Sequence, residues 1–469
     1  MFKKAVLMVF ATMLLIAGAG FASAAQVGGM TSGLGTTLPA GLTVHVNPAG
    51  LGDGLIYGYY NARNALTFFR LVNTSTTHAV KARVRFREAK NSAEILDFNV
   101  CLSNKDQWSA WVLSPTASGP AVIMPVDGGL NALAAWLPDT ITAPNIKNVG
   151  EGGTGVAFKC GSGAGCSSTA TSLKNVTAAD TQEGYWEVIG EAAIDHVGTV
   201  VGAENTKINF TEDQCLNNNG IHDTTTILDV PNVLGGDASV FVVRPTVSGL
   251  FSYNATALAD CRLIQDYSIA DESPDWNACL NGQVGVDYVL TKQNHIAMYN
   301  VESWDKAQTE VIINFPTRSK HDPSTKPFTF GSDKCQPISL NLYNDLQDTT
   351  TTTTDFSPGN TATGASLCNE VNVIKINTSD ILSSGVAKTL DVTSVTPFTG
   401  LGWVRIGLNT SIPAATCATK STSVCFPSTA STHETYGLPS LGYVLTDFLG
   451  SMGQMNQTLY DTQVVTPAP

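Results

Sequence analysis

Apolar and polar residues alternate most clearly in the segment Val80–Glu88, VKARVRFRE. A period of two is typical of a β-strand that buries one face. The apolar face would consist of Val80, Ala82, Val84 and Phe86, and the polar face of Lys81, Arg83, Arg85 and Arg87. The strand-like segments Ala65–Asn73 and Ile95–Leu102 flank this one at short distances. Together the three segments predict an antiparallel meander.

Further strand-like segments recur along the whole chain. They are Tyr185–Gly190, Ser239–Arg244, Leu250–Ala255, Val286–Thr291, Glu310–Phe315, Ile338–Asn344, Asn369–Asn377 and Trp403–Asn409. Helical periodicity is confined to Gly129–Leu137 and Ala255–Arg262. We therefore expect an all-β fold of two antiparallel β-sandwich or jelly-roll-like units, since no fixed repeat period points to a propeller.

Composition shifts indicate two long loops that leave the sandwich and are not linkers between domains. Gly150–Ser168 is rich in glycine, and Gln347–Gly364 contains the run Thr349–Thr354. We expect residues 25–330 to form an N-terminal β-sandwich-like region with loop insertions. Residues 331–469 would form a C-terminal β-sandwich-like region with a polar tail, partly exposed beyond Met452.

The first 24 residues have the pattern of a secretory signal peptide. A basic start with Lys3 and Lys4 precedes an apolar run to about Gly18, and the small residues Ala22 and Ala24 offer a cleavage site after Ala24. A membrane anchor would need about 20 apolar residues without this small-residue exit. We expect a secreted protein, extracellular or on the cell surface, with the periplasm as the alternative and no transmembrane segment in the mature chain.

The polar face of Val80–Glu88 leaves two interpretations open. It could be a solvated face that pairs with acidic neighbours such as Glu88, Glu94 and Asp97. It could also be a stripe that binds an acidic polymer. Rows of charge on exposed strand faces guard against aggregation, which favours the first interpretation.

Composition narrows the class of partner. Only 14% of the 469 residues are charged and the formal net charge is −13. An acidic chain of this kind does not fit nucleic acid as its main partner. The hydrophobic fraction of 43% supplies enough apolar residues for a buried core.

Ten cysteines follow the predicted signal peptide, and none lies in a C-x-x-C motif. That spacing excludes c-type haem attachment, zinc-ribbon and thioredoxin-type sites. An exported chain favours disulfides instead. The pairing hypothesis is Cys160 with Cys166, Cys261 with Cys279, Cys335 with Cys368, Cys417 with Cys425, and Cys101 with Cys215.

The common catalytic motifs are missing from the sequence. It contains no G-x-S-x-G, H-E-x-x-H, P-loop or G-x-G-x-x-G pattern, and its seven histidines are scattered. Glu183, Glu187 and Glu191 could supply paired carboxylates for glycoside hydrolysis, although Trp186 and Val188 favour a strand there. We therefore predict no catalytic residues and no cofactor.

One segment, Glu212–Asp223, has the outline of a calcium loop. With Gly220 at the fixed glycine position, Asn217, Asn219 and Asp223 fall at oxygen-ligand positions, and Asp213 is a further candidate ligand nearby. Cys215 replaces the first ligand and Thr226 stands where a bidentate glutamate is needed. A polar turn held by a disulfide is the alternative.

Several core segments resemble those of a family of uncharacterised secreted bacterial proteins of cell-surface type, rich in β-structure. They are GYYNARNALTFFRLVN, KARVRFREAKNSAEILDFNVCLS, EGYWEVIGEA, FSYNATALAD, INFPTRSKHD, DFSPG with CNEVNVIKIN, and GLPSLGYVL. The resemblance spans nearly the whole mature chain. It implies one integrated exported architecture and no particular activity.

The sequence thus predicts a non-catalytic structural protein that self-associates on the cell surface or outside the cell, as a subunit of a surface layer, sheath or filament. Its main partner would be a second copy, with strand edges or the terminal arms Gln26–Leu38 and Met452–Pro469 as contacts. The first alternative is a module that binds surface glycans through exposed Trp108, Trp111, Trp276 or Trp304. The second is a secreted hydrolase of unrecognised type.

Overall fold

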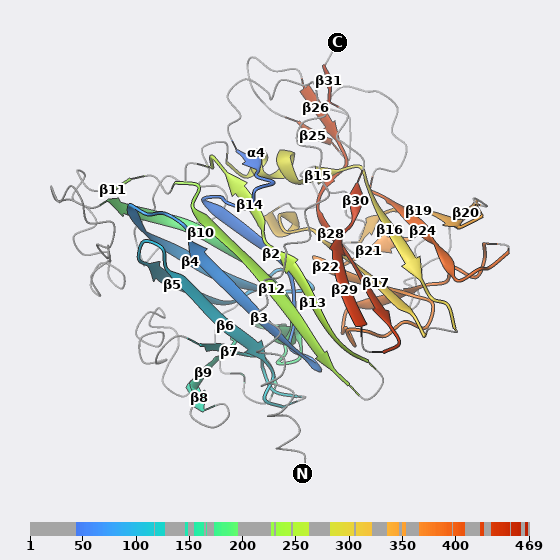
Figure 1. Cartoon of the computed structure of the whole chain (residues 1–469), viewed down its shortest axis with the longest axis horizontal. Coiled ribbons are helices and arrows are strands. Elements are labelled where there is room, and N and C mark those ends of the chain that lie inside the picture. The colour runs from blue at the N-terminus through green and yellow to red at the C-terminus, as the bar shows by residue number, and fades with distance from the viewer. Residues whose placement is uncertain are drawn as a thin grey trace. The chain divides into compact units, whose positions relative to one another are not determined.

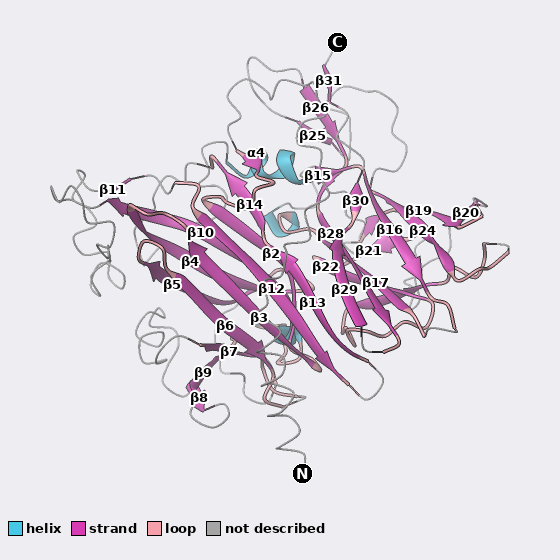
Figure 2. Cartoon of the chain, viewed as in Figure 1, coloured by secondary structure: helices cyan, strands magenta, loops and turns pink. Residues whose placement is uncertain are grey.

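The computed structural model confirms the all-β fold (Figures 1 and 2). The structure describes residues 44–126 except 117, 146–148, 154–163, 166, 173–195, 227–228, 231–261 except 245–246, 282–320 except 304–305, 335–352 except 347–348, 365–408 except 396, 423–425, 433–460 except 451, and 465–467. The predicted signal peptide, the Gly129–Leu137 helix and the arm Gln26–Leu38 lie outside these residues.

Two antiparallel sheets form the first sandwich. Sheet I runs in the order β1 (His45–Val46), β14 (Thr256–Ala259), β2 (Gly54–Asn61), β10 (Glu183–Asp195), β4 (His78–Glu88) and β5 (Glu94–Leu102), with β11 (Ile227–Leu228) beside β10. Sheet II runs in the order β13 (Ser248–Asn254), β12 (Leu234–Val243), β3 (Ala65–Asn73), β6 (Gln107–Leu113), β7 (Val122–Pro125), β9 (Thr154–Ala157) and β8 (Ile146–Asn148).

Trp186 on β10 is at the centre of the core between these two sheets. Its ring stacks on Tyr57 at 4.5 Å and on Phe86 at 5.5 Å, both from sheet I, and it lies 5.0 Å from Phe69 of sheet II. All four side chains are fully buried. Offset and edge contacts of this kind add to the free energy gained from burying large aromatic surfaces.

Two further sheets form the second sandwich. Sheet III runs in the order β23 (Ala387–Leu390), β22 (Val371–Ile376), β17 (Gln308–Asn314), β28 (Leu441–Phe448) and β29 (Met452–Gln457), in which only the β22–β23 pair is parallel. Sheet IV runs in the order β20 (Thr349–Thr352), β19 (Ser339–Asn344), β24 (Leu401–Gly407), β16 (Asn294–Asn300) and β30 (Leu459–Tyr460). Their core contains Val311, Ile374, Leu342 and Val404.

Sheet III buries both faces. Val311 and Ile313 of β17 face the core shared with sheet IV, whereas Ile312 joins the core of the first sandwich. Tyr443 of β28 also belongs to the first core and packs on Gly58 of β2, where an added Cβ would overlap the Tyr443 ring. The two sandwiches therefore share an extensive apolar contact.

The expected boundary at residue 330 is wrong. Strands β16 and β17 precede that residue and pair with C-terminal strands of sheets IV and III. The second sandwich therefore begins no later than Asn294, and the change of sandwich falls after Ala259. Strand pairing over long sequence separations decides this boundary.

The expected meander of three strands is also wrong. Strands β4 and β5 form a hairpin in sheet I, but β3 pairs with β6 and β12 in sheet II. The apolar faces of β3 and β4 cover the same core from opposite sides. Two such strands face each other across the core and do not pair.

Local patterns misassigned three short segments. Val286–Thr291 was expected to be a strand, but α4 (Gly282–Leu290) buries Val286 and Leu290 at helical i, i+4 spacing. The helix expected at Ala255–Arg262 is replaced by β14, which pairs with β1 and β2. The first four residues of the threonine run form β20 because β-branched residues favour strands.

The polar tail also belongs to the sheets. Strand β29 pairs with β28 and β30 pairs with β16, so the backbone from Met452 to Tyr460 lies within sheets III and IV. Three smaller sheets complete the fold: β15 (Thr291–Lys292) with β27 (Leu438–Pro439), β18 (Gln336–Pro337) with β21 (Ser366–Leu367), and β25 (Ser423–Cys425) with β26 (His433–Tyr436) and β31 (Val465–Pro467).

Candidate functional site

The cationic side chains of β4 are buried. Lys81, Arg83, Arg85 and Arg87 have exposed fractions of 1%, 6%, 4% and 5%. The strand and its alternation are as expected, but the polar face is not solvated. Because these side chains are buried, they are also not a surface stripe for an acidic polymer.

Carboxylates from the strands on either side of β4 neutralise these cations. Lys81 lies 3.7 Å from Glu191, Arg85 is 2.8 Å from Glu94, Arg87 is 3.0 Å from Glu187, and Arg83 contacts Asp97. We call these eight side chains the charge ladder. Glu94 and Asp97 were expected partners, whereas Glu187 and Glu191 lie about a hundred residues away in sequence.

Burial and pairing act in opposite directions on the ladder. Burial alone would lower the pKa of Arg87, but Glu187, Tyr185 and Glu94 together outweigh burial and raise it. Burial likewise works to raise the pKa of Glu94, and the guanidinium groups of Arg85 and Arg87 lower it. Burial lowers the pKa of Lys81, and Glu191 offsets part of that shift. Arg87 and Glu94 are therefore held ionised inside the protein.

The three glutamates considered for glycoside hydrolysis all have other partners. Glu187 and Glu191 belong to the ladder. Glu183 accepts hydrogen bonds from the Tyr59 hydroxyl at 2.9 Å, the Ser384 hydroxyl at 2.5 Å and the Gly385 amide at 2.8 Å. Glu183 thus holds a loop of the second sandwich against the first.

The cavity that Glu183 helps to line is small. Its volume is about 30 Å³, and its lining includes Arg63, Glu88, Lys90, Asp180 and Gly385. A single water molecule occupies about 30 Å³ in the liquid. This cavity is too small for a sugar ring.

A serine and a histidine meet in the second sandwich. His295 Nε2 lies 2.8 Å from the Ser440 hydroxyl, and Nδ1 lies 2.7 Å from the Thr458 hydroxyl. The Ser440 hydroxyl also lies 3.1 Å from the Leu438 carbonyl, to which it can donate. Both ring nitrogens of His295 therefore have hydroxyl groups of the protein itself as hydrogen-bond partners.

Burial supports a structural role for this pair. Ser440 and His295 have exposed fractions of 0% and 1%. Burial, followed by the nearby Lys292, lowers the pKa of His295 to about 3 and keeps the ring neutral. A substrate could not reach the serine without opening the sandwich.

The tryptophans expected to bind sugars are not equally available. Trp108 is a core residue that packs on Phe69 and Phe98. Trp111 is half-buried beside Phe68 and Phe241 on the outward face of sheet II. Trp276 and Trp304 lie outside the described residues.

Sequence reasoning missed the aromatic pair on the outward face of sheet IV. Trp403 of β24 stacks on Tyr343 of β19 with centroids 3.8 Å apart, and Met298 of β16 is the cross-strand neighbour of Trp403. The exposed Leu459 pairs with Ile296 one row further along. We call these five residues the sheet IV face; the alternation in Trp403–Asn409 could have indicated it.

The sheet IV face is apolar and accessible. Met298 is 66% exposed and Leu459 is 56% exposed, while Ile296, Tyr343 and Trp403 are half-buried. The half-buried polar residues Arg405 and Asn341 adjoin the aromatic pair in the next row. Exposed apolar side chains grouped on one sheet face are typical of an interaction surface.

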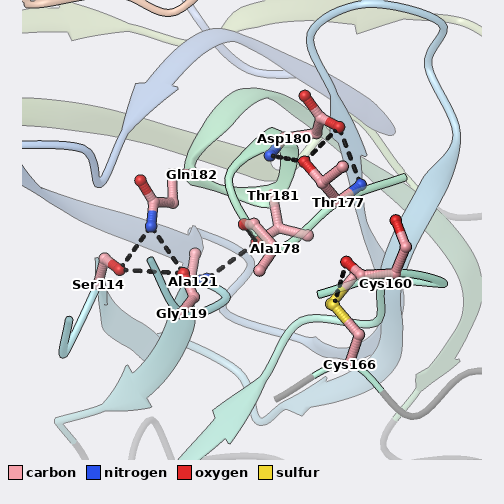
Figure 3. Close-up of a disulfide and its surroundings, with 11 residues drawn as sticks. Ser114, Gly119, Ala121, Cys160, Cys166, Thr177, Ala178, Asp180, Thr181 and Gln182 are labelled. Atoms are coloured by element: carbon pink, nitrogen blue, oxygen red, sulfur yellow. Dashed lines mark hydrogen bonds between the residues drawn. A yellow bond between two sulfur atoms is a disulfide. The ribbon is translucent and has the colours of Figure 1, made fainter. Parts of the chain in front are cut away.

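Two of the expected disulfides are present. Cys160 is bonded to Cys166, as Figure 3 shows, and Cys335 is bonded to Cys368. Cys101 and Cys261 are also disulfide-bonded. The partners expected for them, Cys215 and Cys279, lie outside the described residues, as does Cys417 of the expected pair with Cys425.

The predicted calcium ligands Asp213, Asn217, Asn219 and Asp223 also lie outside the described residues. Elsewhere in the part of the chain that is described, no three His, Cys, Asp or Glu side chains are grouped to hold a metal ion. No helix of that part is long and apolar enough to span a membrane. Comparisons with protein-family models, curated proteins and solved structures found no match, so the family resemblance stays a prediction.

Proposed function

We propose that this protein is a non-catalytic, exported structural protein whose copies associate with one another on the cell surface or outside the cell. The protein would be a subunit of a surface layer, sheath or filament. The observation that carries this proposal is the sheet IV face, with its grouped and exposed apolar side chains.

The sheet IV face has the chemistry of a protein contact. The side chains of Met298, Ile296 and Leu459 offer no hydrogen-bonding group, and together with the aromatic pair they cover cross-strand positions on four strands. Burying such a face against a second copy contributes about 25 cal/mol of favourable free energy for each Å² of apolar surface removed from water. A half-buried arginine beside aromatic rings is also common at protein contacts.

The interior supports a structural role in a second way. The cations of β4 that suggested polymer binding are paired with carboxylates inside the first sandwich, and Glu187 and Glu191, two of the glutamates that suggested catalysis, are among those carboxylates. Disulfides link residues within each sandwich. These features favour persistence outside the cell, where a protein that unfolds has no chaperones to rescue it.

Glycan binding is the second candidate, and the Trp403–Tyr343 pair favours it. Aromatic rings stack on sugar rings, and Arg405 and Asn341 could supply hydrogen bonds beside them. The two rings stack on each other, however, so each has at most one face left for a ligand. This arrangement favours the protein partner.

Analytical ultracentrifugation and electron microscopy of the full mature chain test the proposal. The Met298→Lys variant is expected to remain folded and to lose self-association, because a lysine ammonium in an apolar contact has no counter-charge. Val126→Lys is the matched control, since Val126 is 52% exposed and directly follows β7 of sheet II, in the first sandwich. Equal loss in both variants, or no assembly of the wild type, would contradict the proposal.

A glycan array separates the two candidates. The proposal expects no binding that depends on Trp403. Glycan binding by a monomeric wild type that is lost in Trp403→Ala would establish the second candidate instead.

A further inference from the structure

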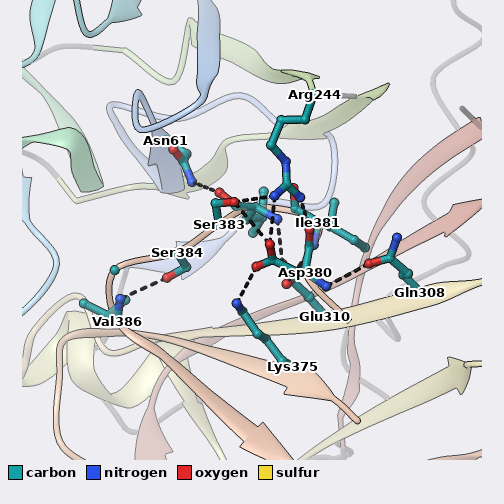
Figure 4. Close-up of polar contacts among 12 residues, drawn as sticks. Asn61, Arg244, Gln308, Glu310, Lys375, Asp380, Ile381, Ser383, Ser384 and Val386 are labelled. Atoms are coloured by element: carbon teal, nitrogen blue, oxygen red, sulfur yellow. Dashed lines mark hydrogen bonds and ion pairs between the residues drawn. The ribbon is translucent and has the colours of Figure 1, made fainter. Parts of the chain in front are cut away.

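Several groups of hydrogen bonds join the two sandwiches within the described residues, and three of these groups, here called ties, each lie beside a buried carboxyl group. The first tie is the loop from Asn377 to Val386, which follows β22 (Figure 4). Asn61 of β2 donates to the Leu382 carbonyl at 2.9 Å, and the Arg244 guanidinium donates to the Ile381 carbonyl at 2.6 Å. This loop of the second sandwich is therefore held by side chains of the first.

The second tie lies at the other end of β22. There the Val371 amide donates to the Ala89 carbonyl at 2.9 Å, and the Glu370 amide donates to the Lys90 carbonyl at 3.4 Å. These bonds attach the turn between β4 and β5 to the second sandwich. Both ends of one strand are thus anchored in the first sandwich.

The third tie joins the edges of sheets II and III, where β13 lies beside β29 (Figure 1). The Ser248 amide donates to the Gly450 carbonyl at 2.8 Å. Gly450 belongs to the turn between β28 and β29.

Each tie has a buried carboxyl group that forms no ion pair within the described residues. Glu310 contacts the loop of the first tie, Glu370 immediately precedes β22, and Asp447 precedes the β28–β29 turn. Their exposed fractions are 0%, 4% and 0%.

Glu310 holds the first tie directly. Its two carboxyl oxygens accept the amides of Ile381 at 2.9 Å and Leu382 at 3.1 Å. Burial raises the pKa of Glu310 to about 7; the two amides and Lys375 work against this shift, while Asp380 adds to it. The Tyr59 hydroxyl also lies close enough for Glu310 to raise its pKa.

Glu370 and Asp447 behave in the same way. Burial raises the pKa of Glu370 to about 8, with Glu88 adding to the shift and Arg318, Arg87 and Ser92 opposing it. Burial raises the pKa of Asp447 to about 6 against the amides of Gly450 and Met452. Oε2 of Glu370 has no hydrogen-bond partner in the structure.

We propose that the junction between the sandwiches is a pH-responsive joint, closed in mildly acidic medium and loosened as the medium becomes alkaline. The three carboxyl groups are neutral when the joint is closed. Their ionisation would place negative charge in buried sites at all three ties.

Proton linkage determines whether the closed joint gains or loses stability as the pH rises. A carboxyl whose folded pKa lies above its ordinary value binds its proton more tightly in the closed form. The stabilisation is complete below the ordinary pKa, near 4.5, and is lost as the pH rises through about 6 to 8. Asp180, Glu94 and Asp380 have lowered pKa values, so their contributions are lost only in stronger acid.

Hydrogen exchange of the full chain tests the joint. Protection of the peptide that covers residues 377–386 is compared at pH 5.5 and pH 8.5 after correction for the intrinsic exchange rate. We expect at least about a tenfold loss of protection at the higher pH, since one pKa unit corresponds to a tenfold change in an equilibrium constant. A peptide from the core strand β10 should keep its protection, which separates joint opening from global unfolding.

Variants identify the groups responsible. The double variant Glu310→Gln and Glu370→Gln should remove most of the pH-dependent change. Glu302→Gln, a change at a partly exposed glutamate outside the junction, should preserve it. If the double variant does not fold, Glu370→Gln alone should reduce the pH dependence. Protection that does not vary with pH in the wild type, or that varies equally in the folded glutamine variant, would overturn the proposal.

Discussion

The charge ladder makes a quantitative prediction about the Arg87–Glu187 pair. Arg87 Nε lies 3.0 Å from Glu187 Oε2, and the two side chains are 7% and 2% exposed. Replacing Glu187 with alanine leaves the guanidinium buried with Glu94 4.0 Å away as its remaining partner. Removing one partner of a buried ion pair lowers the free energy of unfolding by about 3–5 kcal/mol. We expect a loss at the lower end of this range, because Arg87 still donates to the Ser92 carbonyl.

An exposed pair in the same protein supplies the matched control. Arg70 and Asp237 form the same arginine–carboxylate contact at 2.7 and 3.0 Å, with side chains 45% and 30% exposed. Asp237→Ala should therefore cost less than about 1 kcal/mol, as is usual for solvated ion pairs. The two variants differ chiefly in the burial of the guanidinium that remains.

The assay is urea unfolding under non-reducing conditions, monitored by tryptophan fluorescence. The double variant Arg87→Met with Glu187→Leu removes both charges and fills much the same space. Its free energy of unfolding should lie within about 1–2 kcal/mol of the wild type, because both charges of the pair are removed and neither is left without its partner. Two results would contradict this reasoning. One is a loss of unfolding free energy in Glu187→Ala that is no larger than the loss in Asp237→Ala. The other is a loss in the double variant as large as the summed losses of Arg87→Met and Glu187→Leu measured separately.

Three further outcomes follow from the packing. Gly58→Ala should lower the free energy of unfolding by about 1–3 kcal/mol, because the added methyl group overlaps the Tyr443 ring. The loss should be smaller when Tyr443 is also replaced by alanine. Strictly additive losses from the two changes would contradict this contact. Removing the Cys335–Cys368 bridge, whose cysteines are 33 residues apart, should lower the free energy of unfolding by about 4 kcal/mol on the chain-entropy estimate. Denaturation under non-reducing conditions measures this loss. A loss smaller than the one caused by removing the Cys160–Cys166 bridge, whose cysteines are six residues apart, would contradict the estimate. Fluorophosphonate probes should leave Ser440 unlabelled in the native protein, and labelling detected by mass spectrometry would revive the hydrolase alternative.

The alternation in Val80–Glu88 was enough to predict a strand but not the environment of its polar face. A period of two shows that two faces differ, and it does not show which of them meets water. The partners Glu187 and Glu191 lie on β10, which the chain reaches only after a hundred residues and several other strands. Only their pairing across sheet I explains why four cations can be buried.

Other elements show the same limit. The strands in Glu310–Phe315 and Trp403–Asn409 were predictable because apolar and β-branched residues dominate them. Their sheet partners were not predictable, and the expected domain boundary failed for that reason. The Val286–Thr291 segment was ambiguous because short apolar runs fit a buried helix as well as a strand.

The sheet IV face cannot be predicted from single aromatic residues in the sequence. Trp403 and Tyr343 lie sixty residues apart and become a stacked pair only through the register of β19 with β24. By contrast, the bridges at Cys160–Cys166 and Cys335–Cys368 were predictable, because nearest-neighbour pairing along the chain is a reasonable guide when the enclosed loops are short.

The central claim, that this is a structural protein whose copies assemble, is tested most directly by measuring the molar mass of the purified mature chain across a concentration series. Light scattering coupled to size-exclusion chromatography gives that mass, and electron microscopy shows the form of any assembly. The claim predicts species larger than one chain that grow with concentration and are lost in Met298→Lys. A single monomeric species at the highest concentration would contradict it.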